Sequence, residues 1–348
     1  MAGEISLDVF HGDAFSAISL TAAIQRNPYQ PTELGSLNLF TPVPMLTTAL
    51  RVEERTGKLV LIPYSERGTA GKQRETEKRT TRYFETPRLA HEDTVYAYEL
   101  QNVVQFGSPQ ELMQVQQEID RRLNGPTGLN ASMEYTKEYA RLGAIQGVTL
   151  DPGTGQPLYN WYDEFQITQP AEWGFNLVAN VESTLRPILN KIIRAVARKA
   201  QGCWTPSSHV GALCGDDWYD AFTTHKDVKQ TFLNWSAAAD LRAATGAAFD
   251  HFNFGGVEFI NYRGSDDNVT LKVPDGQVKF FPINAPGVFQ EALAPGEAFK
   301  WMNKPGQSVY IQPIIDRDRD EWFKMEAKSY PLYVCTRPET LQTGRIGA

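Results

Sequence analysis

Cysteine is scarce in this chain, and the spacings that build disulfide frameworks or zinc sites are missing. The 348 residues include three cysteines, Cys203, Cys214 and Cys335, which lie far apart without Cys-x-x-Cys spacing. An odd, sparse set of this kind argues against a disulfide scaffold and fits a reducing cytoplasm. The histidines form no His-x-x-x-His pair, which excludes a zinc site made from neighbours on one helix. We therefore expect no metal and no other cofactor.

Long apolar runs and an excess of positive charge are also missing. No apolar run approaches the ~20 residues of a membrane-spanning helix, and the first residues lack the basic and apolar regions of a secretory signal. We expect a soluble chain with no membrane partner. Lysine and arginine number 34 against 41 aspartate and glutamate, a net charge of −7. Proteins that track DNA carry excess positive charge, so DNA contact is expected to be non-specific only.

Catalytic motifs are equally scarce. No Gly-x-Ser-x-Gly nucleophile elbow occurs, and the one partial match to a phosphate-binding loop lacks its first glycine and its hydroxyl residue. His209, Asp216 and Asp217 are the candidates for a hydrolase or transferase site within 181–315. The simpler interpretation is that Asp216 caps the helix that begins with Trp218. We expect no enzyme, and we assign no catalytic, cofactor-binding or metal-binding residue.

The first ninety residues contain little that could form a core of its own. Residues 1–45 hold one short apolar helical pattern and several prolines, which predicts an arm. Strand-like alternation then begins, with a turn expected at 55–58 and a returning strand at 59–62. Residues 65–88 mix cations with glutamates and strand-forming residues. We interpret 46–90 as an extended two-stranded loop, while a solvated surface hairpin is the simpler alternative.

A long, interrupted helix is the clearest local prediction. Ser108–Glu111 forms a capping box with proline at the first helical position, and an apolar stripe at helical spacing follows it. Gly125–Gly128 interrupts the pattern, which then resumes and ends at Gly147 as a C-terminal cap. Each part would be ~24 Å long at 1.5 Å per residue. The two parts predict a kinked strut.

Short helices and strands alternate in the remainder of the chain. A hairpin at 148–161 precedes a basic amphipathic helix at 181–200. Four further elements are expected, namely a strand at 209–213, a helix at 216–222, a strand at 257–262 and a hairpin that joins 269–273 to 278–281. We interpret 181–315 as a separate α/β domain. Residues 322–335 are again strand-like and apolar.

Several stretches, taken in this order, resemble motifs of one family. The most specific is Glu134–Gly147, EYTKEYARLGAIQG, followed by Leu150 and Asp151. Weaker matches are GKLVLIP at 57–63, FETP at 84–87, ELQNV at 99–103 and FGS at 106–108. From about residue 45 to 340 the chain resembles the lambda-type major capsid protein E family of tailed bacteriophages, which has the Hong Kong 97 capsid fold.

The resemblance implies a fold, a function and partners. The fold would be α+β, with an N-terminal arm (1–45), an extended loop (46–90), a peripheral domain with a spine helix (91–180), an axial domain (181–315) and a return strand (316–348). The function would be a head protein that assembles into hexamers and pentamers of an icosahedral shell around double-stranded DNA, formed in the host cytoplasm. Another phage structural protein, of the tail or baseplate, is the second alternative beside the enzyme.

The same resemblance implies contacts and further partners. The extended loop would lie over the neighbouring subunit. Its expected intersubunit contacts are Leu50, Val52, Leu59, Leu61, Arg67, Lys72, Arg74, Arg79 and Arg82. Besides further copies of the chain, the implied partners are a separate scaffolding protein, the portal and a trimeric decoration or cement protein.

Overall fold

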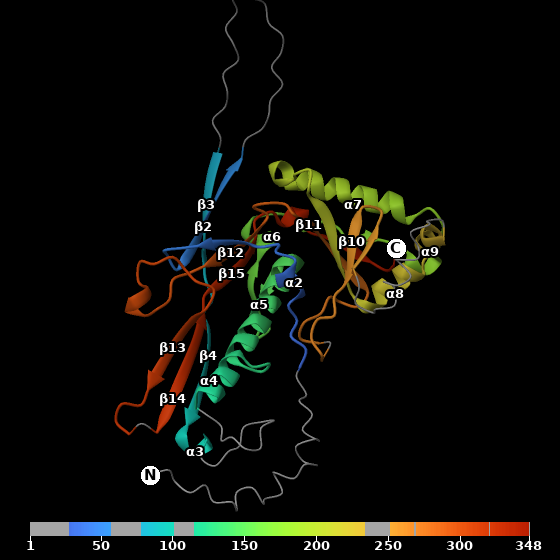
Figure 1. Cartoon of the computed structure of the whole chain (residues 1–348). Helices are drawn as coiled ribbons and strands as arrows, with labels where there is room; N and C mark the ends of the chain where they lie inside the picture. The colour runs from blue at the N-terminus through green and yellow to red at the C-terminus, as the bar shows by residue number, and fades with distance from the viewer. Residues whose placement is uncertain are drawn as a thin grey trace, which may run out of the picture.

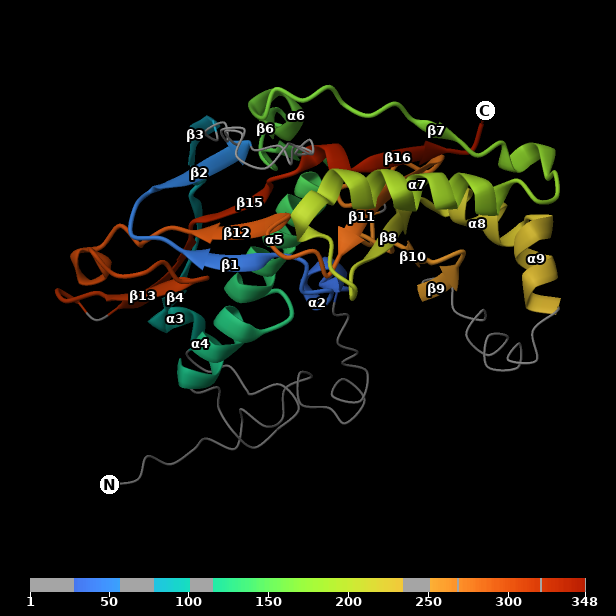
Figure 2. The same ribbon diagram turned by 90° about the horizontal axis from the view of Figure 1, so that it is seen from above.

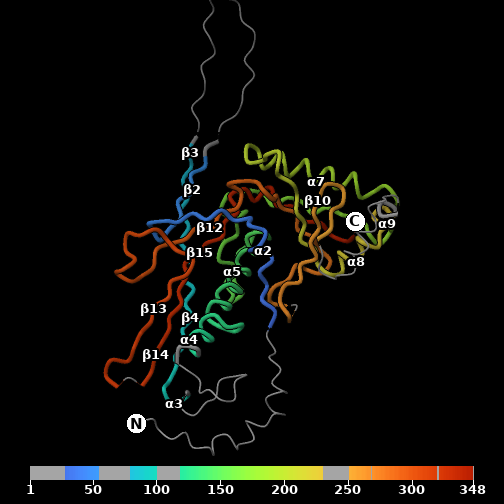
Figure 3. The backbone as a smooth tube through the Cα atoms, viewed as in Figure 1, coloured from blue at the N-terminus to red at the C-terminus, as the bar shows by residue number. Residues whose placement is uncertain are grey.

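The chain builds an elongated molecule with two halves and a projecting ribbon (Figures 1 and 3). The computed structural model describes residues 28–56, 78–100, 115–233, 251–267, 269–319 and 321–347. Helices and strands are mixed, as the α+β prediction requires. Within these ranges no helix combines the length and the apolar character that crossing a membrane demands.

A six-stranded sheet forms the half at the right of Figure 1. Its strands lie in the order β7 (Trp173–Gly174), β16 (Gln342–Arg345), β11 (Gln277–Ile283), β8 (His209–Cys214), β10 (Val257–Asn261) and β9 (His251–Phe254). β8 is parallel to β10 and antiparallel to β11. One sheet face packs against three helices, α7 (Leu185–Ala200), α8 (Asp216–Thr224) and α9 (Lys226–Leu233).

Two three-stranded sheets form the other half. One has the order β13 (Tyr310–Ile315), β14 (Trp322–Ser329) and β4 (Leu89–Tyr96), and the other has β1 (Thr41–Pro44), β12 (Phe289–Leu293) and β15 (Pro331–Cys335). The main core joins the halves, because Leu213 and Phe281 of the six-stranded sheet pack in one cluster with Leu142, Phe289 and Val334.

The strut is two helices, α4 (Val115–Asn124) and α5 (Leu129–Gln146), with the predicted interruption between them. Gly147 caps α5 in the left-handed region at φ 88°, and a Cβ there would meet the ring of Tyr162 at 2.4 Å. Glycine is therefore required at this position. The expected capping box at Ser108–Glu111 lies outside the described residues.

Short elements connect these parts. The predicted hairpin after the strut is β5 (Val148–Leu150) with β6 (Pro157–Asn160). A ribbon of β2 (Ala49–Thr56) and β3 (Lys78–Glu85) projects upward in Figure 1. The remaining short helices are α2 (Glu33–Ser36), α3 (Ala97–Leu100), α6 (Trp161–Glu164), η3 (Leu177–Ala179), η4 (Gln201–Cys203), η5 (Phe299–Trp301) and η6 (Pro338–Thr340).

Three local predictions were wrong, each for a physical reason. The expected turn does not begin at Arg55, because β2 continues through Thr56, where it pairs with Lys78 of β3, and residues 57 and 58 lie outside the described residues. Residues 269–273 form no strand, because β8 and β16 already occupy both edges of β11. Asp216 does not cap α8: the N-cap is Gly215, where a Cβ would meet the carbonyl oxygen of Pro274 at 2.4 Å.

The sheets also cross the domain boundaries expected from sequence. β7 lies before residue 181 and β16 lies in the expected return segment, yet both belong to the six-stranded sheet. β12 and β13 fall within 181–315, yet both lie in sheets of the other half. The strand-like stretch 322–335 divides at Tyr330 into two strands of different sheets. Pairing of strands far apart in sequence, which no local pattern records, decides these memberships.

Candidate intersubunit surfaces

The β2–β3 ribbon has one face turned to the body and one face turned away. Because side chains alternate along a strand, the pair Leu50 and Phe84 shares a face with Val52 and Arg82. Leu50 and Phe84 are 5% and 2% exposed. The opposite face begins with the pair of Arg51 and Tyr83, both exposed, and Tyr83 is 67% exposed. A large aromatic surface of this kind is available to a partner.

Aromatic side chains fix the base of the ribbon. The Phe84 ring lies 5.5 Å from that of Trp161, edge to face, and 5.9 Å from that of Phe165. The Tyr159 hydroxyl donates a hydrogen bond to the Glu85 carbonyl at 2.9 Å. The ribbon is therefore rooted in the main core, while its further residues extend away from the body (Figure 1).

The residues of the ribbon that were expected to contact another subunit lie in different environments. Leu50 is buried in the core of its own subunit, which leaves only 5% of it exposed for the expected intersubunit contact. Val52 is half-buried, and Arg82 lies over the Phe165 ring and pairs with Glu54 at 2.6 Å. Arg79 is exposed. The other expected contacts lie outside the described residues, namely Leu59, Leu61, Arg67, Lys72 and Arg74.

Two exposed residues of the ribbon were missed. Arg51 and Tyr83 occupy the outer face, and Arg51 pairs with Glu53 on the same strand. The alternation of Leu50 and Val52 with charged residues could have identified this face, since alternate positions of a strand point to opposite sides. Identifying Tyr83 as part of this face also required the pairing of β2 with β3, two strands that are far apart in sequence.

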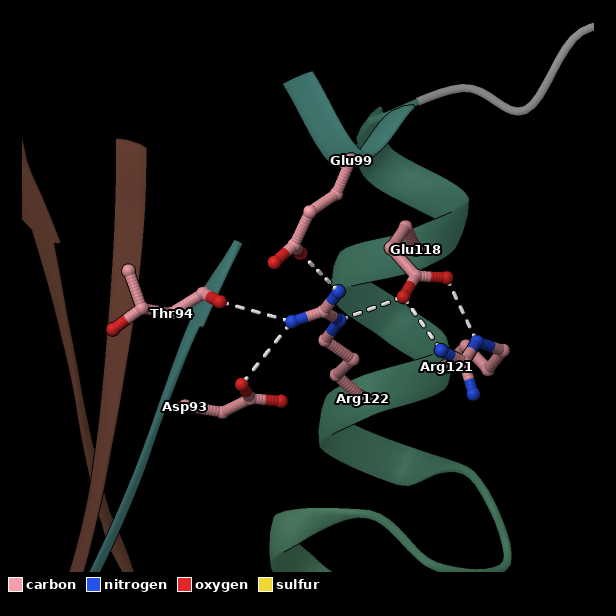
Figure 4. A network of polar contacts seen from close by, with 6 residues as sticks. All are labelled: Asp93, Thr94, Glu99, Glu118, Arg121 and Arg122. Carbon is pink, nitrogen blue, oxygen red and sulfur yellow. Dashed lines mark hydrogen bonds and ion pairs between the residues drawn. The ribbon is translucent and has the colours of Figure 1, made fainter. Parts of the chain in front are cut away.

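A polar network fastens the strut to strand β4 (Figure 4). The Arg122 guanidinium donates to Glu118 at 2.6 Å, to Glu99 at 2.7 Å and to the Thr94 carbonyl at 2.9 Å. Glu118, which is 3% exposed, also accepts two hydrogen bonds from Arg121. These hydrogen bonds lower the pKa of Glu118 to about 2. The network links α4 with the sheet beside it.

Replacing Arg122 with methionine is expected to loosen this attachment. The change removes the guanidinium from Glu118, Glu99 and Asp93 while it keeps most of the apolar stem. We expect the free energy of unfolding to fall by about 2 kcal/mol, less than for a fully buried pair, because Arg121 still holds Glu118. Urea unfolding measures the loss, and Arg186→Met, on another helix, is the matched control. An unchanged urea midpoint would contradict the role of the network.

The N-terminal arm is fastened to the strut and to the six-stranded sheet. The Glu138 carboxylate, fully buried on α5, accepts the backbone N–H groups of Leu34 at 2.6 Å and Gly35 at 3.2 Å. Glu33 of the same turn pairs with His251 of β9 at 3.4 Å. Burial raises the pKa of Glu33 to about 7, although His251 opposes the shift. The arm thus has two separate attachments.

The raised pKa of Glu33 predicts a pH dependence with a definite sign. A carboxyl group that binds its proton more tightly when folded stabilises the fold at low pH, and this contribution is lost as the pH rises from about 4.5 to about 7. We expect the urea midpoint of the unmodified protein to fall across this window. In the Glu33→Gln variant the fall should be smaller. An equal fall in both proteins would show that other groups cause it.

The residues of the enzyme alternative are not brought together. His209 opens β8 and Asp216 follows its end, so the strand separates them by roughly 17 Å at 3.3 Å per residue. The His209 imidazole instead contacts Glu258 at 3.2 Å. All three cysteines are free, and burial raises the pKa values of the Cys214 and Cys335 thiols, which are inert in that state. Among the described residues, no cluster of three potential metal ligands occurs.

Comparison with known proteins agrees with this architecture. The chain is 24% identical over 317 residues to the major capsid protein of Pseudomonas phage KPP10, which covers 85% of this chain and 87% of the relative. It is 22% identical over 365 residues to the major capsid protein of Salmonella phage Felix O1, covering 96% and 97%. The capsid structure of cyanophage P-SCSP1u matches with a TM-score of 0.53 at 10% identity, covering 93% of this chain and 91% of that one.

The structural likeness confirms the fold predicted from the sequence, that of phage capsid proteins. The family model described as Phage major capsid protein E matches residues 16–346, which is nearly the whole chain. The chain therefore belongs to the phage major capsid protein E family.

Proposed function

We propose that this chain is the major head protein of a tailed phage, which assembles into hexamers and pentamers that close an icosahedral shell around double-stranded DNA. The family match along residues 16–346 is the observation that carries this function. The form of the subunit supports it, because the ribbon extends beyond the body and exposes an aromatic side chain, Tyr83. The function is structural, as the family implies.

The outer face of the ribbon and its continuation form the proposed contact with the next subunit. Arg79 is retained from the expected contacts, and Arg51 and Tyr83 are added to it, whereas Leu50 and Arg82 contact the subunit's own core. The expected contacts beyond the ribbon remain part of the proposal, namely Leu59, Leu61, Arg67, Lys72 and Arg74. A strand that joins a neighbour's sheet edge gains main-chain hydrogen bonds, and alternating charges set the register of the contact.

The halves of the molecule have different proposed places in a capsomer. The six-stranded half, with α7, α8 and α9, would be the axial domain and would meet its copies at the capsomer centre. The half with the strut would be the peripheral domain. Each subunit then contacts several others, so modest individual contacts combine into a strong shell.

Further partners belong to the same proposal. A separate scaffolding protein and the portal would take part in assembly in the host cytoplasm, and a trimeric decoration protein would bind the finished virion shell. The net charge of −7 supports a container that encloses DNA without adhering to it. Packaged DNA would be contacted only non-specifically.

Negative-stain microscopy of the purified protein, co-expressed with its scaffolding protein, tests the function. Closed shells or ring-shaped capsomers are the expected result. Tubes of fixed width would favour the alternative of a tail or baseplate protein. A monomer or dimer that persists at high concentration would contradict shell formation.

A further inference from the structure

Helix α7 carries a row of cations on the side that faces away from the sheet. Its sixteen residues hold five cations and no carboxylate. Lys191, Arg194 and Arg198 each follow a buried apolar residue by two positions, which is about half a turn at 3.6 residues per turn. All three are exposed, and within the described residues none of them forms an ion pair.

The position of these cations is not explained by the helix itself. Cations near the C-terminus of a helix interact favourably with its dipole, which accounts for Arg198 but not for Lys191 and Arg194. Like charges three and four residues apart repel one another and destabilise a helix. An unpaired row of this kind therefore indicates an anionic partner outside the subunit.

Helix α8 carries the complementary charge. Trp218 and Phe222 are buried toward the sheet, while Asp217 and Asp220 are exposed and Asp216 is half-buried. The helix contains no cation, and within the described part of the chain none of the three aspartates forms an ion pair. The dipole favours Asp216 and Asp217 in the first turn, but Asp220 lies beyond it. Asp216 and Asp217 are the two acidic residues of the enzyme alternative.

The two helices lie on different edges of the same half. In Figure 1, α7 runs along the upper edge of the six-stranded half and α8 lies at its lower edge. Figure 2 gives the view from above, in which α8 lies partly behind α7. Within one subunit both helices pack with their apolar sides on one cluster, and their charged residues are on the sides exposed to solvent. In a ring built head to tail, one surface of each copy meets a different surface of the next copy.

We propose that the exposed face of α7 in one subunit packs against the exposed face of α8 in the next subunit of a capsomer. The contact rests on the proposed shell function and adds to it a specific pair of surfaces, separate from the ribbon. Opposite charges across such a contact steer association and exclude wrong registers. Because every copy carries both surfaces, the contact repeats until the ring closes. A second copy is favoured over DNA because the acidic counterpart belongs to the same half of the chain.

Charge exchange tests the pairing directly. One variant reverses α7 (Lys191→Glu, Arg194→Glu and Arg198→Glu), a second reverses α8 (Asp217→Lys and Asp220→Lys), and a third combines all five changes. We expect each single-helix variant to reduce the yield of closed particles at least tenfold. The combined variant should recover most of the yield, because the charges are exchanged and not removed.

Controls separate this inference from the proposed function. Glu164→Lys makes a change of two charge units on α6 and should leave the particle yield unchanged. Circular dichroism and gel filtration establish that each variant subunit is folded, and Lys191→Gln with Asp220→Asn provides a milder pair. If the unmodified protein forms shells and both reversed variants give normal yields, the α7–α8 contact is overturned while the proposed function stands. A combined variant that recovers none of the particle yield would have the same meaning. Normal shells that fail only in retaining DNA would assign the α7 cations to phosphate instead. Absence of any particle from unmodified protein would contradict the proposed function itself.

Discussion

Shortening the ribbon is expected to abolish shells while it leaves the subunit folded. Thr56 and Lys78 are directly paired at the last described step of the β2–β3 ladder. Replacing residues 57–77 with Asn-Gly therefore closes the ladder with a two-residue turn, which is the preferred hairpin connection. The base of the ribbon keeps its packing against Trp161 and Phe165. Only the part that we assign to the neighbouring subunit is lost.

Two measurements read out this variant. The urea midpoint should stay close to that of the unmodified protein, because the main core is untouched. Closed particles in negative stain should fall at least a hundredfold. A matched control shortens a different exposed turn, that of the β5–β6 hairpin at 151–156, to Asn-Gly. Normal shells from the 57–77 variant would contradict the assignment of this segment to a neighbour.

Removing the Glu138 carboxylate is expected to cost more stability than removing the Arg122 guanidinium. Glu138→Ala takes away the acceptor for two backbone N–H groups of the arm, at Leu34 and Gly35, and it also removes the partner of Arg141 at 3.2 Å. All of these groups lie in a buried or half-buried environment. Breaking a buried charged network by removing one partner costs about 3 kcal/mol or more.

The loss should be seen in two ways. The free energy of unfolding from urea titration should fall by about 3 kcal/mol, and limited proteolysis should cut the arm between residues 28 and 40 faster than in the unmodified protein. Glu164→Ala removes an exposed carboxylate from α6 and should change neither measurement. A variant as stable and as resistant as the unmodified protein would show that Glu138 does not hold the arm.

The helices of the strut, together with α7 and α8, were predictable from sequence because their signals are local, whereas α9 was not predicted. The end of α5 at Gly147 follows from glycine's access to positive φ. The amphipathic pattern of α7 was visible in its spacing, although α7 begins at Leu185, four residues later than expected. A helix forms its backbone hydrogen bonds within its own segment, so the residues of that segment are enough to predict it.

The partners of the strands were not predictable in the same way. β11 looked like half of a local hairpin because Pro274–Gly276 is a good turn, yet its partners are β8 and the distant β16. Leu50 looked like a contact for another subunit because nothing near it in sequence reveals the aromatic cluster of Phe84 and Trp161. Burial by residues far along the chain decided both cases.

Ion pairing across the chain was equally hidden. The attachment of the arm depends on Glu138, which lies in the middle of a helical pattern. From sequence alone a carboxylate at such a position is expected to be solvated, whereas Glu138 is buried. The charges of α7 are visible in the sequence, but whether a cation has an ion-pair partner depends on residues that are far from it in sequence.

Electron cryo-microscopy of assembled particles is the most direct test of the central claim, that identical copies complete contacts which a single subunit leaves open. We predict that the outer face of the ribbon, marked by Tyr83, is covered in the particle by a neighbouring subunit. Closed particles in which Tyr83 faces solvent, or in which each ribbon lies folded on its own subunit, would contradict the claim.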